Sequence, residues 1–371
     1  MNSAISGKWL VVTDRNAVLE LKDQWRSLEA RSNGGTPFQS FSWCHQWLKH
    51  RGKDYTPYIL IRADQQIIAP FAIAPTARSR VLRLIGTGDS DYLGLVTTMA
   101  SGEAWEAVIA ALHERRSEWH LLHLHSVKQK GDIISALGRY KDFSVIEREY
   151  EKCPVLSITG TWEAYLGRMK KVRYETRRWA KRVHEVGAVT MEPVSLPVSP
   201  ALLEEMIDVE RDSWKWESGT AALKPGEQAD FVSAVLQDPM MPARVWCLRT
   251  NGKLVAFAVV LEDKTGWYYY LPSFRGSCPN AGAHLLSCIV EEAFKNDREF
   301  VDLLQGNHGY KALWSDDTIA VAEILTANSL RGSIMLQGYV ARWAAAKSNV
   351  LRRLRNVVGK VGDRREMNHV G

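Results

Sequence analysis

The sequence has 371 residues, of which 46% are hydrophobic and 24% are charged, a composition that excludes a disordered or fibrous protein. Its net charge of +6 is carried by residues 331–371, where nine basic residues face only Asp363 and Glu366, so no nucleic-acid partner is expected for the protein as a whole. We expect a cytoplasmic protein, because the sequence shows neither a signal peptide nor a run of about 18 apolar residues.

The length and the order of the predicted elements indicate two α/β units with a boundary near 150–158. In the first unit, Asp14 or Asn16 can cap a helix, and a β-hairpin turns at Asp64–Gln65. The elements expected in this unit are strands over 8–13, within 56–77, around the turn in 84–97 and over 119–127, and helices within 14–30, 38–50 and 103–116.

The second unit begins near Cys153 and repeats this order. Thr161 is expected to cap a long helix that Gly187 stops, and Asn251–Gly252 joins two strands through a tight type I′ turn. The other expected elements are a strand over 188–194, helices within 200–216 and 229–236, three strands within 244–274, a helix within 281–297 and a strand over 299–304. Two related half-domains, 1–155 and 156–330, follow from this order, and 331–371 has the pattern of a basic amphipathic helix.

The stretch 268–314 carries the strongest chemical signal. A loop with Pro279 and Gly282 opens a helix, so free backbone N–H groups and the positive end of the helix dipole meet at one place. Such a place binds phosphate groups well. A purely structural strand-to-helix turn is the alternative.

The segments YYYLPSF, RGSCPNAGAHLLSCIVEEAF and EFVDLLQGNHGYKALW, in this order, resemble the signature of the CelD-like acetyltransferases of the GNAT superfamily. That signature is a strand, an S-P-G loop, a helix and D-F-L-x-G…Y-K…W. The resemblance extends to the basic helix 162–187 and more weakly to FQSFSWCHQW and LIGTGDSDYLGL, so it touches most of 38–315. One departure is that Asn280 and Ala281 separate Pro279 from Gly282.

The resemblance implies an α/β (α+β) fold of two tandem GNAT-like half-domains with mixed, largely antiparallel sheets, the first degenerate and the second catalytic. It also implies acetyl-CoA or another acyl-CoA as co-substrate, without a metal, and a sugar-linked or small amine or hydroxyl acceptor in exopolysaccharide or cell-envelope assembly. The residues that would hold the acyl-CoA are Tyr270, Leu271, Cys278, Pro279, Asn280, Ala281 and Gly282.

The same resemblance places four candidate catalytic residues. Asp302 is a candidate base, Tyr310 a candidate acid, and Lys311 can hold an anionic substrate or polarise the acyl carbonyl. Glu210, on a helix that would border the acceptor cleft, is a second candidate base. The alternative is that Asp302 caps a loop, Tyr310 packs in the core and Lys311 is a solvated charge.

Candidate acceptor-binding residues follow from the basic helix and two tryptophans. The helix RMKKVRYETRRWAKR carries eight basic residues against Glu175, a density that an anionic ligand or solvent must offset. The candidates for a phosphate-bearing acceptor are Arg173, Arg177, Arg178, Trp214 and Trp314. A solvated helix face, with Trp314 in the core, is the alternative.

The histidines and cysteines do not form a predicted metal site. His123 and His125 lie on one strand face and His120 lies elsewhere, which favours hydrogen-bonded histidines. The five cysteines are scattered without a C-x-x-C pair and are expected to be free thiols.

Two other functions stay open at this point. A Fem-like aminoacyltransferase pairs GNAT halves and takes aminoacyl-tRNA, but the long helical insertion usual for that family is not visible. A non-catalytic scaffold would keep the fold and use the basic tail. That tail could reach the inner face of the membrane or a pathway partner, or it could pack on the body.

Overall fold

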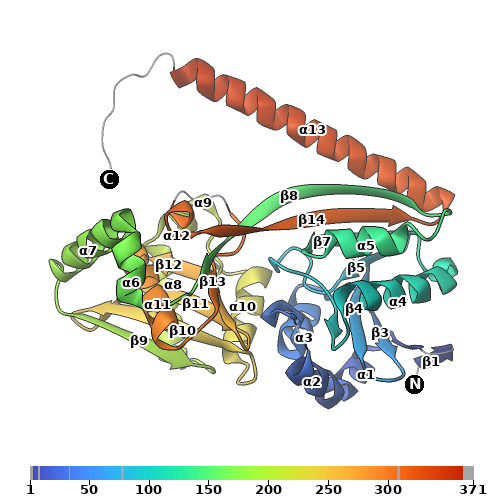
Figure 1. Ribbon diagram of the computed structural model, residues 1–371, viewed down its shortest axis with the longest axis horizontal. Coiled ribbons are helices and arrows are strands. Elements are labelled where there is room, and N and C mark those ends of the chain that lie inside the picture. Colours follow the sequence, from blue (N-terminus) through green and yellow to red (C-terminus); the bar gives the residue numbers. More distant parts are fainter. Residues whose placement is uncertain (1–2, 7–8, 33, 77–78, 307–309, 362–371) are drawn as a thin grey trace.

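Two α/β halves lie side by side and are joined by two long strands, β8 (Ser144–Ser157) and β14 (Asp317–Ala327) (Figure 1). This computed structural model describes residues 3–6, 9–32, 34–76, 79–306 and 310–361, and it describes side chains only between 9 and 345. The mixed α/β class predicted from the sequence is confirmed.

Over the described residues, the strands form one 14-stranded sheet that crosses both halves. Its order is β1-β2-β3-β4-β5-β7-β14-β8-β13-β12-β11-β10-β9, with β6 beside β4. The pairs β5–β7 and β12–β13 are parallel, and the other neighbouring strands are antiparallel. The remaining strands are β1 (Ser3–Ser6), β2 (Trp9–Val12), β3 (Thr56–Arg62), β4 (Ile67–Ala74), β5 (Val81–Leu84), β6 (Val96–Thr97), β7 (Leu121–Val127), β9 (Val189–Ser195), β10 (Ala243–Thr250), β11 (Lys253–Glu262), β12 (Gly266–Phe274) and β13 (Phe300–Asp302).

Each parallel pair needs a crossover, and a helix supplies it in both halves. The crossover is α4 (Ser101–Glu114) between β5 and β7, and α11 (Ala281–Lys295) between β12 and β13. The other helices are α1 (Arg15–Glu20), α2 (Lys22–Arg31), α3 (Phe41–His50), α5 (Lys130–Leu137), α6 (Trp162–Arg168), α7 (Lys170–His184), α8 (Pro200–Arg211), α9 (Trp214–Ser218), α10 (Glu227–Gln237), α12 (Lys311–Trp314) and α13 (Leu330–Val361), with 3₁₀ turns at Pro37–Gln39 and Arg116–Glu118.

The two halves exchange strands at their junction. β8 follows the N-terminal half but pairs with β13 of the C-terminal half, and β14 follows the C-terminal half but pairs with β7. Val155 of β8 faces both Asp302 and Asp317. The boundary predicted near 155 therefore falls inside a strand that both halves share.

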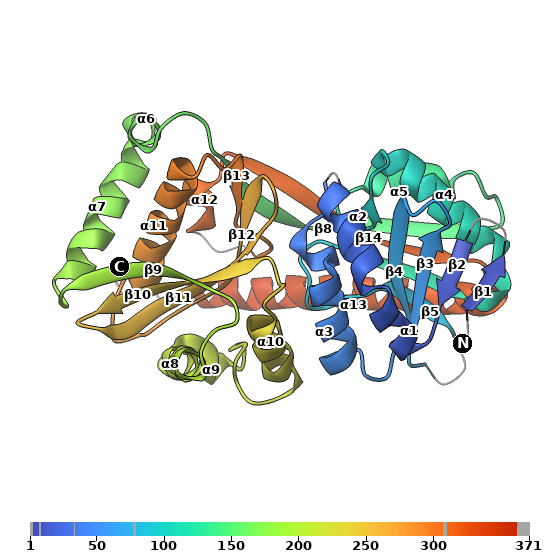
Figure 2. The same ribbon diagram turned by 90° about the horizontal axis from the view of Figure 1, so that it is seen from below.

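Helices cover both faces of the sheet, and one core runs between the halves. α4 and α5 pack on one face of the N-terminal strands, while α6, α7 and α11 pack on one face of the C-terminal strands. Between the halves, α3 lies against α10, where the rings of Trp43 and Phe231 are 5.0 Å apart (Figure 2). The continuous apolar contact explains why this junction is buried rather than open to solvent.

Local predictions of caps and turns are confirmed. Asp14 caps α1 by accepting hydrogen bonds from Asn16 N and Ala17 N, and Thr161 caps α6 by accepting from Ala164 N. Asn251 and Gly252 have φ values of 49° and 79°, as a type I′ turn requires.

Three predicted long helices are each divided, so these predictions were wrong in extent. The helix after Thr161 breaks at Met169 into α6 and α7, the helix within 14–30 divides at Leu21, and the helix within 200–216 divides at Asp212–Ser213. Near Met169, Gly167 lowers helix propensity and a run of like charges follows, both of which weaken the helix there.

The first part of α13 packs on the N-terminal half. Leu336, Tyr339 and Trp343 contact a small core cluster of β7 and β14, and Arg83 donates a hydrogen bond to Tyr339 at 2.8 Å. The packed alternative thus holds for this part, and the basic residues predicted after 346 lie outside the described side chains. A search of the described helices finds none with the length and apolarity needed to cross a membrane.

Candidate functional site

β12 and β13 separate shortly after they begin to pair. Their parallel register runs over Gly266↔Phe300, Trp267↔Val301 and Tyr268↔Asp302, after which β12 continues to Phe274 while β13 ends. Tyr270 is an extra residue in the pairing of β12 with β11, which forms a β-bulge just beyond the last parallel pair. Because a bulge bends its strand and increases its twist, it accounts for the opening between the two strands.

The helix α11 begins beside this opening. Asn280 lies in the left-handed region with φ 68°, and Cys278 N and Ala281 N bond to carbonyls of the loop itself. Among the described residues, Gly282 N and Ala283 N find no acceptor. Free N–H groups at the positive end of a helix dipole are the kind of place that accepts an anion.

Gly282 also lies against β12. A Cβ atom built at Gly282 would lie 2.5 Å from the Phe274 ring. Of the predicted cofactor residues, Tyr270 and Leu271 lie on β12 and pack with the core between the halves, Cys278 is buried in the loop, and Pro279, Asn280, Ala281 and Gly282 lie at the helix start.

Asp302 is buried where the two strands separate. Its carboxylate accepts hydrogen bonds of 2.7 Å from Tyr92 Oη and 2.7 Å from Leu304 N. Burial raises the pKa of Asp302 to about 6, although both hydrogen bonds lower it. A carboxyl group that titrates near neutral pH can take up a proton during a reaction.

Lys311 is buried in the same region and is not a solvated charge. Its Nζ donates to Leu304 O at 3.1 Å and to Gln305 O at 2.6 Å, which holds the chain that follows β13. Burial lowers the pKa of Lys311, and the Asp91 carboxylate acts against that shift. Asp302 and Lys311 thus bracket one turn of the chain, at Leu304 and Gln305.

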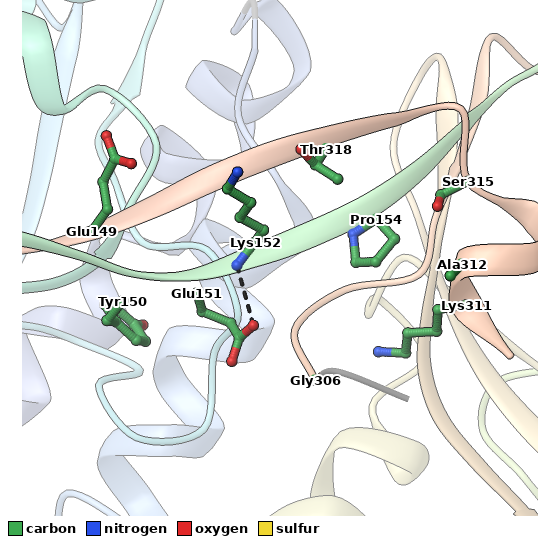
Figure 3. A pocket seen from close by; sticks show the side chains of 10 residues that line it. All are labelled: Glu149, Tyr150, Glu151, Lys152, Pro154, Gly306, Lys311, Ala312, Ser315 and Thr318. Carbon is green, nitrogen blue, oxygen red and sulfur yellow. Dashed lines mark hydrogen bonds between the residues drawn. The ribbon is translucent and has the colours of Figure 1, made fainter. Parts of the chain in front are cut away.

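A cavity of about 550 Å³ lies beside Lys311. Figure 3 shows Lys311 pointing into it from α12, with side chains of β8 and β14 on the other sides. The lining residues are Glu149, Tyr150, Glu151, Lys152, Pro154, Gly306, Lys311, Ala312, Ser315 and Thr318. The cavity has room for a small polar molecule next to Lys311, and Asp302 is not among its lining residues.

Tyr310 and Glu210 lie on other elements than Asp302. Tyr310 is 37% exposed at the start of α12, where burial raises its pKa to about 12. Glu210 is fully buried on α8 and accepts a hydrogen bond from Leu223 N at 2.7 Å. Lys215, on the neighbouring α9, donates to the carbonyl of Pro272, so this helix pair borders the end of β12.

The predicted acceptor-binding residues are scattered. Arg173 and Arg177 are exposed on α7, Arg178 pairs with Glu175 at 2.7 Å, and Trp214 is 53% exposed on α9. Trp314 is buried among Trp162 and Trp179 and has a packing position. The structure does not bring these five side chains together.

Sequence reasoning missed the contribution of the N-terminal half. Tyr92 reaches across to Asp302, and Lys128 Nζ lies 4.6 Å from the Tyr92 ring centroid. A second cavity of about 280 Å³ lies between the halves, lined by Gly88, Asp89, Ser90, Asp91, His125, Ser126, Gln228, Tyr270 and Gln305. The only signal in the sequence was the weak resemblance of LIGTGDSDYLGL, which contains Tyr92.

The histidines of β7 are hydrogen-bonded, as predicted. His123 Nε2 lies 2.7 Å from Glu323, and His125 Nδ1 lies 2.9 Å from Ser126 Oγ. The cysteines are free thiols. Over the described residues, no group of three or more His, Cys, Asp or Glu side chains is arranged to hold a metal ion.

Comparisons with known proteins agree with this geometry. Residues 170–312 match the model of the family described as acetyltransferase (GNAT) domain. That range contains the opening between β12 and β13 and the start of α11. None of the curated proteins matches the sequence.

Solved structures share the fold over most of the chain. The C-terminal domain of a putative lysylphosphatidylglycerol synthetase from Agrobacterium fabrum superposes with a TM-score of 0.59 at 13% identity, covering 86% of this chain and 95% of that one. The crystal structure of FemX superposes with a TM-score of 0.60 at 9% identity, covering 82% of this chain and 95% of that one. A conserved protein of unknown function from Bacteroides thetaiotaomicron superposes with a TM-score of 0.57 at 14% identity, covering 83% of this chain and 97% of that one. At these identities the likeness shows the fold alone.

Proposed function

We propose that this protein is an acyl-CoA-dependent acyltransferase that moves an acetyl or related acyl group to an amine or hydroxyl of a small or sugar-linked acceptor. In this proposal residues 156–330 bind the donor, and residues 1–155 complete the site from the other side. The resemblance to CelD-like acetyltransferases supports a role in exopolysaccharide or cell-envelope assembly, in the cytoplasm or at the inner face of the membrane.

The observation that carries the proposal is the opening between β12 and β13 next to the start of α11. Among the residues that the structure describes, none pairs with the β13-facing edge of β12 beyond Tyr268, so the amide groups of a pantetheine arm can bond to it as a missing strand would. The pyrophosphate then lies at Gly282 N and Ala283 N.

The reaction would take place where the strands separate. Asp302 would remove the proton of the acceptor, whose nitrogen or oxygen then attacks the acyl carbon while the carbon–sulfur bond breaks. The departing thiolate needs a proton, and Tyr310 is the candidate donor. Lys311 would keep the turn at Leu304 and Gln305 in place and supply positive charge beside the acceptor cavity.

Calorimetric titration with acetyl-CoA and with free CoA tests the donor, with protein melting followed in parallel. Micromolar binding with a raised melting temperature is the expected result, because a ligand that binds only the folded state stabilises it. The absence of binding to both ligands would overturn the proposal.

A second candidate donor is an aminoacyl-tRNA, and the basic helix α7 is the observation that favours it. Its exposed side chains include Lys170, Lys171, Arg173, Arg177 and Lys181, with Tyr174 65% exposed among them. Basic groups with an aromatic side chain between them suit an RNA backbone. Binding of charged tRNA that weakens steeply with salt, together with no binding of acetyl-CoA, would favour this donor; binding of neither, with no effect of changes at Lys311, would favour the scaffold.

A further inference from the structure

A β-bulge in β7 sets the direction in which Lys128 points. Two residues of β7, at 125 and 126, lie opposite the single residue Glu323 of β14. Because of the extra residue, Leu124 and Val127 both pack in the N-terminal core, although they are three positions apart. Lys128 follows Val127 and therefore faces the other side of the sheet, toward the junction of the halves. In a regular strand it would have shared the apolar side with Leu124.

Lys128 and Asp302 both contact Tyr92. Lys128 Nζ lies 4.6 Å from the centroid of the Tyr92 ring, and Tyr92 Oη donates a hydrogen bond of 2.7 Å to Asp302 Oδ2. A positive charge is attracted to the face of an aromatic ring. In a low-dielectric interior it also polarises the phenol, which makes the hydroxyl a better donor. Tyr92 and Asp302 are both fully buried, so solvent screens these interactions little.

The effects of these groups on one another agree with this arrangement. Burial lowers the pKa of Lys128, and the Asp302 carboxylate is the charge that most opposes this shift. Burial raises the pKa of Asp302 to about 6 against the hydrogen bonds from Tyr92 and Leu304 N. Among the neighbouring charges, Lys128 then lowers the pKa of Asp302 more than Lys311 does.

Lys311 is matched to a different carboxylate. Burial raises the pKa of Asp91 to about 6 and lowers the pKa of Lys311, and each of these two groups is the charge that most opposes the shift of the other. The charges of Asp91 and Asp302 disfavour each other, so each carboxylate needs a cation of its own. The remaining titratable groups that face Asp302 are neutral when protonated: Tyr92, Cys153 of β8 and Tyr268 of β12.

We propose that Lys128 is a positioning residue through which the N-terminal half keeps Asp302 ionised and able to take the proton of the acceptor. This inference rests on the proposed role of Asp302 as the base. Tyr92 holds the carboxylate by a hydrogen bond, and the Lys128 ammonium favours its negative charge. Lys128 keeps its own proton throughout, and the acyl group passes directly from the thioester to the acceptor.

Replacement of Lys128 tests the inference through the rate of CoA release between pH 5 and 9. Lys128→Met removes the charge at a similar side-chain length, so the acid limb of the profile should move to higher pH by roughly one unit or more. The rate at pH 5 should then fall roughly tenfold, while the plateau above pH 8 stays nearly unchanged. Lys128→Arg keeps a positive charge over the ring and should restore the wild-type profile.

Lys130→Met is the matched control. Lys130 lies two positions further along and pairs at the surface with Glu147 and Glu149, so its loss should leave the acid limb in place. Melting curves show that each variant is folded. An unmoved limb in Lys128→Met, or the same shift in Lys128→Arg or in Lys130→Met, would overturn the inference.

A second measurement needs no turnover. The aspartate carboxyl groups are labelled with carbon-13, and the NMR signal of Asp302 is identified by its absence from Asp302→Asn. The titration of that signal should shift upward in Lys128→Met even if calorimetry finds no binding of acetyl-CoA, in which case the proposed donor fails and this inference stands. If the signal titrates alike in the wild type and in Lys128→Met, the inference is wrong whatever calorimetry shows.

Discussion

The two halves contain the same strand-helix-strand unit, but only one of them is open. In the N-terminal half, β5 and β7 pair over Val81↔Leu121 to Arg83↔His123, the same three-residue register that joins β12 and β13. After β5, however, the chain returns and Leu93 pairs with Val127, with Leu93 N bonded to Ser126 O at 2.9 Å. Beyond Tyr268, in contrast, β12 continues without β13 beside it.

This difference indicates that a shared strand-helix-strand topology is not sufficient for a donor site. The N-terminal half closes its own opening, and the returning segment carries Tyr92, which reaches Asp302 at the corresponding place in the C-terminal half. His123 occupies the register position of Asp302 but is bonded to Glu323 at 2.7 Å. Three pairs of equivalent positions therefore provide internal controls: Gly102 and Gly282, His123 and Asp302, and Lys130 and Lys311.

The largest expected effect is the loss of acetyl-CoA affinity when the second residue of the crossover helix α11 is changed. Gly282 and Gly102 are each the second residue of their crossover helix. Gly282→Trp would place an indole at the phosphate site and displace Phe274, whose ring already lies within 2.5 Å of a Cβ at this position. Acetyl-CoA binding should weaken by roughly a hundredfold or more, measured by calorimetry.

Gly102→Trp is the control for this change. The nearest atom to a Cβ at Gly102 is Asp132 Oδ1 at 3.6 Å, an ordinary contact. Affinity should stay unchanged in that variant. Equal losses in both variants would mean that the halves do not differ as donor sites, and unchanged affinity in Gly282→Trp would move the site elsewhere.

The next largest effect is expected on the rate of acyl transfer, when Asp302 of the last β12–β13 residue pair is changed. Asp302→Asn should reduce CoA release from acetyl-CoA by roughly 10² to 10⁴, the range for loss of a general base. Because the pKa of Asp302 is raised to about 6 and a base acts in its deprotonated form, the wild-type rate should fall as pH drops below about 6. Asp302→Asn should lose this acid limb.

His123→Asn is the control at the equivalent register position. It breaks the bond to Glu323 and should lower the melting temperature, yet it should keep the acid limb near pH 6. Rate profiles from pH 5 to 9 make the comparison. An unchanged profile in Asp302→Asn would remove Asp302 from the role of base.

Much of this architecture could be predicted from the sequence, because its signals are local. Periodicity, caps and turn residues such as Thr161 and Asn251–Gly252 report on a few neighbouring positions, and they gave the element order and the loop before α11. The break at Met169 was missed because the apolar positions continue in phase through it, and Gly167 and the like charges that follow are weak signals by comparison.

The parts that could not be predicted depend on contacts between distant segments. The bond from Tyr92 to Asp302 joins residues 210 positions apart, and Ser126 meets Gln305 across 179 positions. The exchange of β8 and β14 between the halves also has no local signal, and neither strand was among the elements expected from the sequence. The family pattern located Asp302 and Lys311 but not the side chains that surround them.

A smaller effect on the rate of CoA release is expected from a change at Lys311, the first residue of the helix that follows the parallel pair β12–β13. Lys311→Met keeps the length of the side chain but leaves Leu304 O and Gln305 O without their donor, which costs about 1 to 3 kcal/mol per buried group. CoA release should slow by roughly tenfold to a hundredfold as the turn after β13 loosens.

Lys130→Met is the matched change in the N-terminal half. Lys130 begins α5 after β7 and pairs with Glu147 and Glu149, each at 3.3 Å, at the surface. Because such exposed pairs contribute little, this variant should keep the wild-type rate. A scaffold without catalytic function would show no difference between the two lysine variants in any assay of turnover.

The smallest expected effect reports on the contact between the halves. Tyr92→Phe removes the hydrogen bond that favours the charged form of Asp302, so the pKa of Asp302 should rise further above about 6. The acid limb of the rate profile should move to higher pH by roughly one unit, with the plateau above pH 8 nearly unchanged.

Tyr58→Phe controls for the loss of a buried tyrosine hydroxyl. Tyr58 donates to Glu118 at 2.7 Å within the N-terminal half, away from the opening, so the acid limb should stay where it is. A shift in Tyr92→Phe alone would mean that the N-terminal half sets part of the proton affinity of Asp302 in the C-terminal half. If neither variant moves the limb, Tyr92 only packs between the halves, and the acidity of Asp302 is set by its burial and by the bond from Leu304 N.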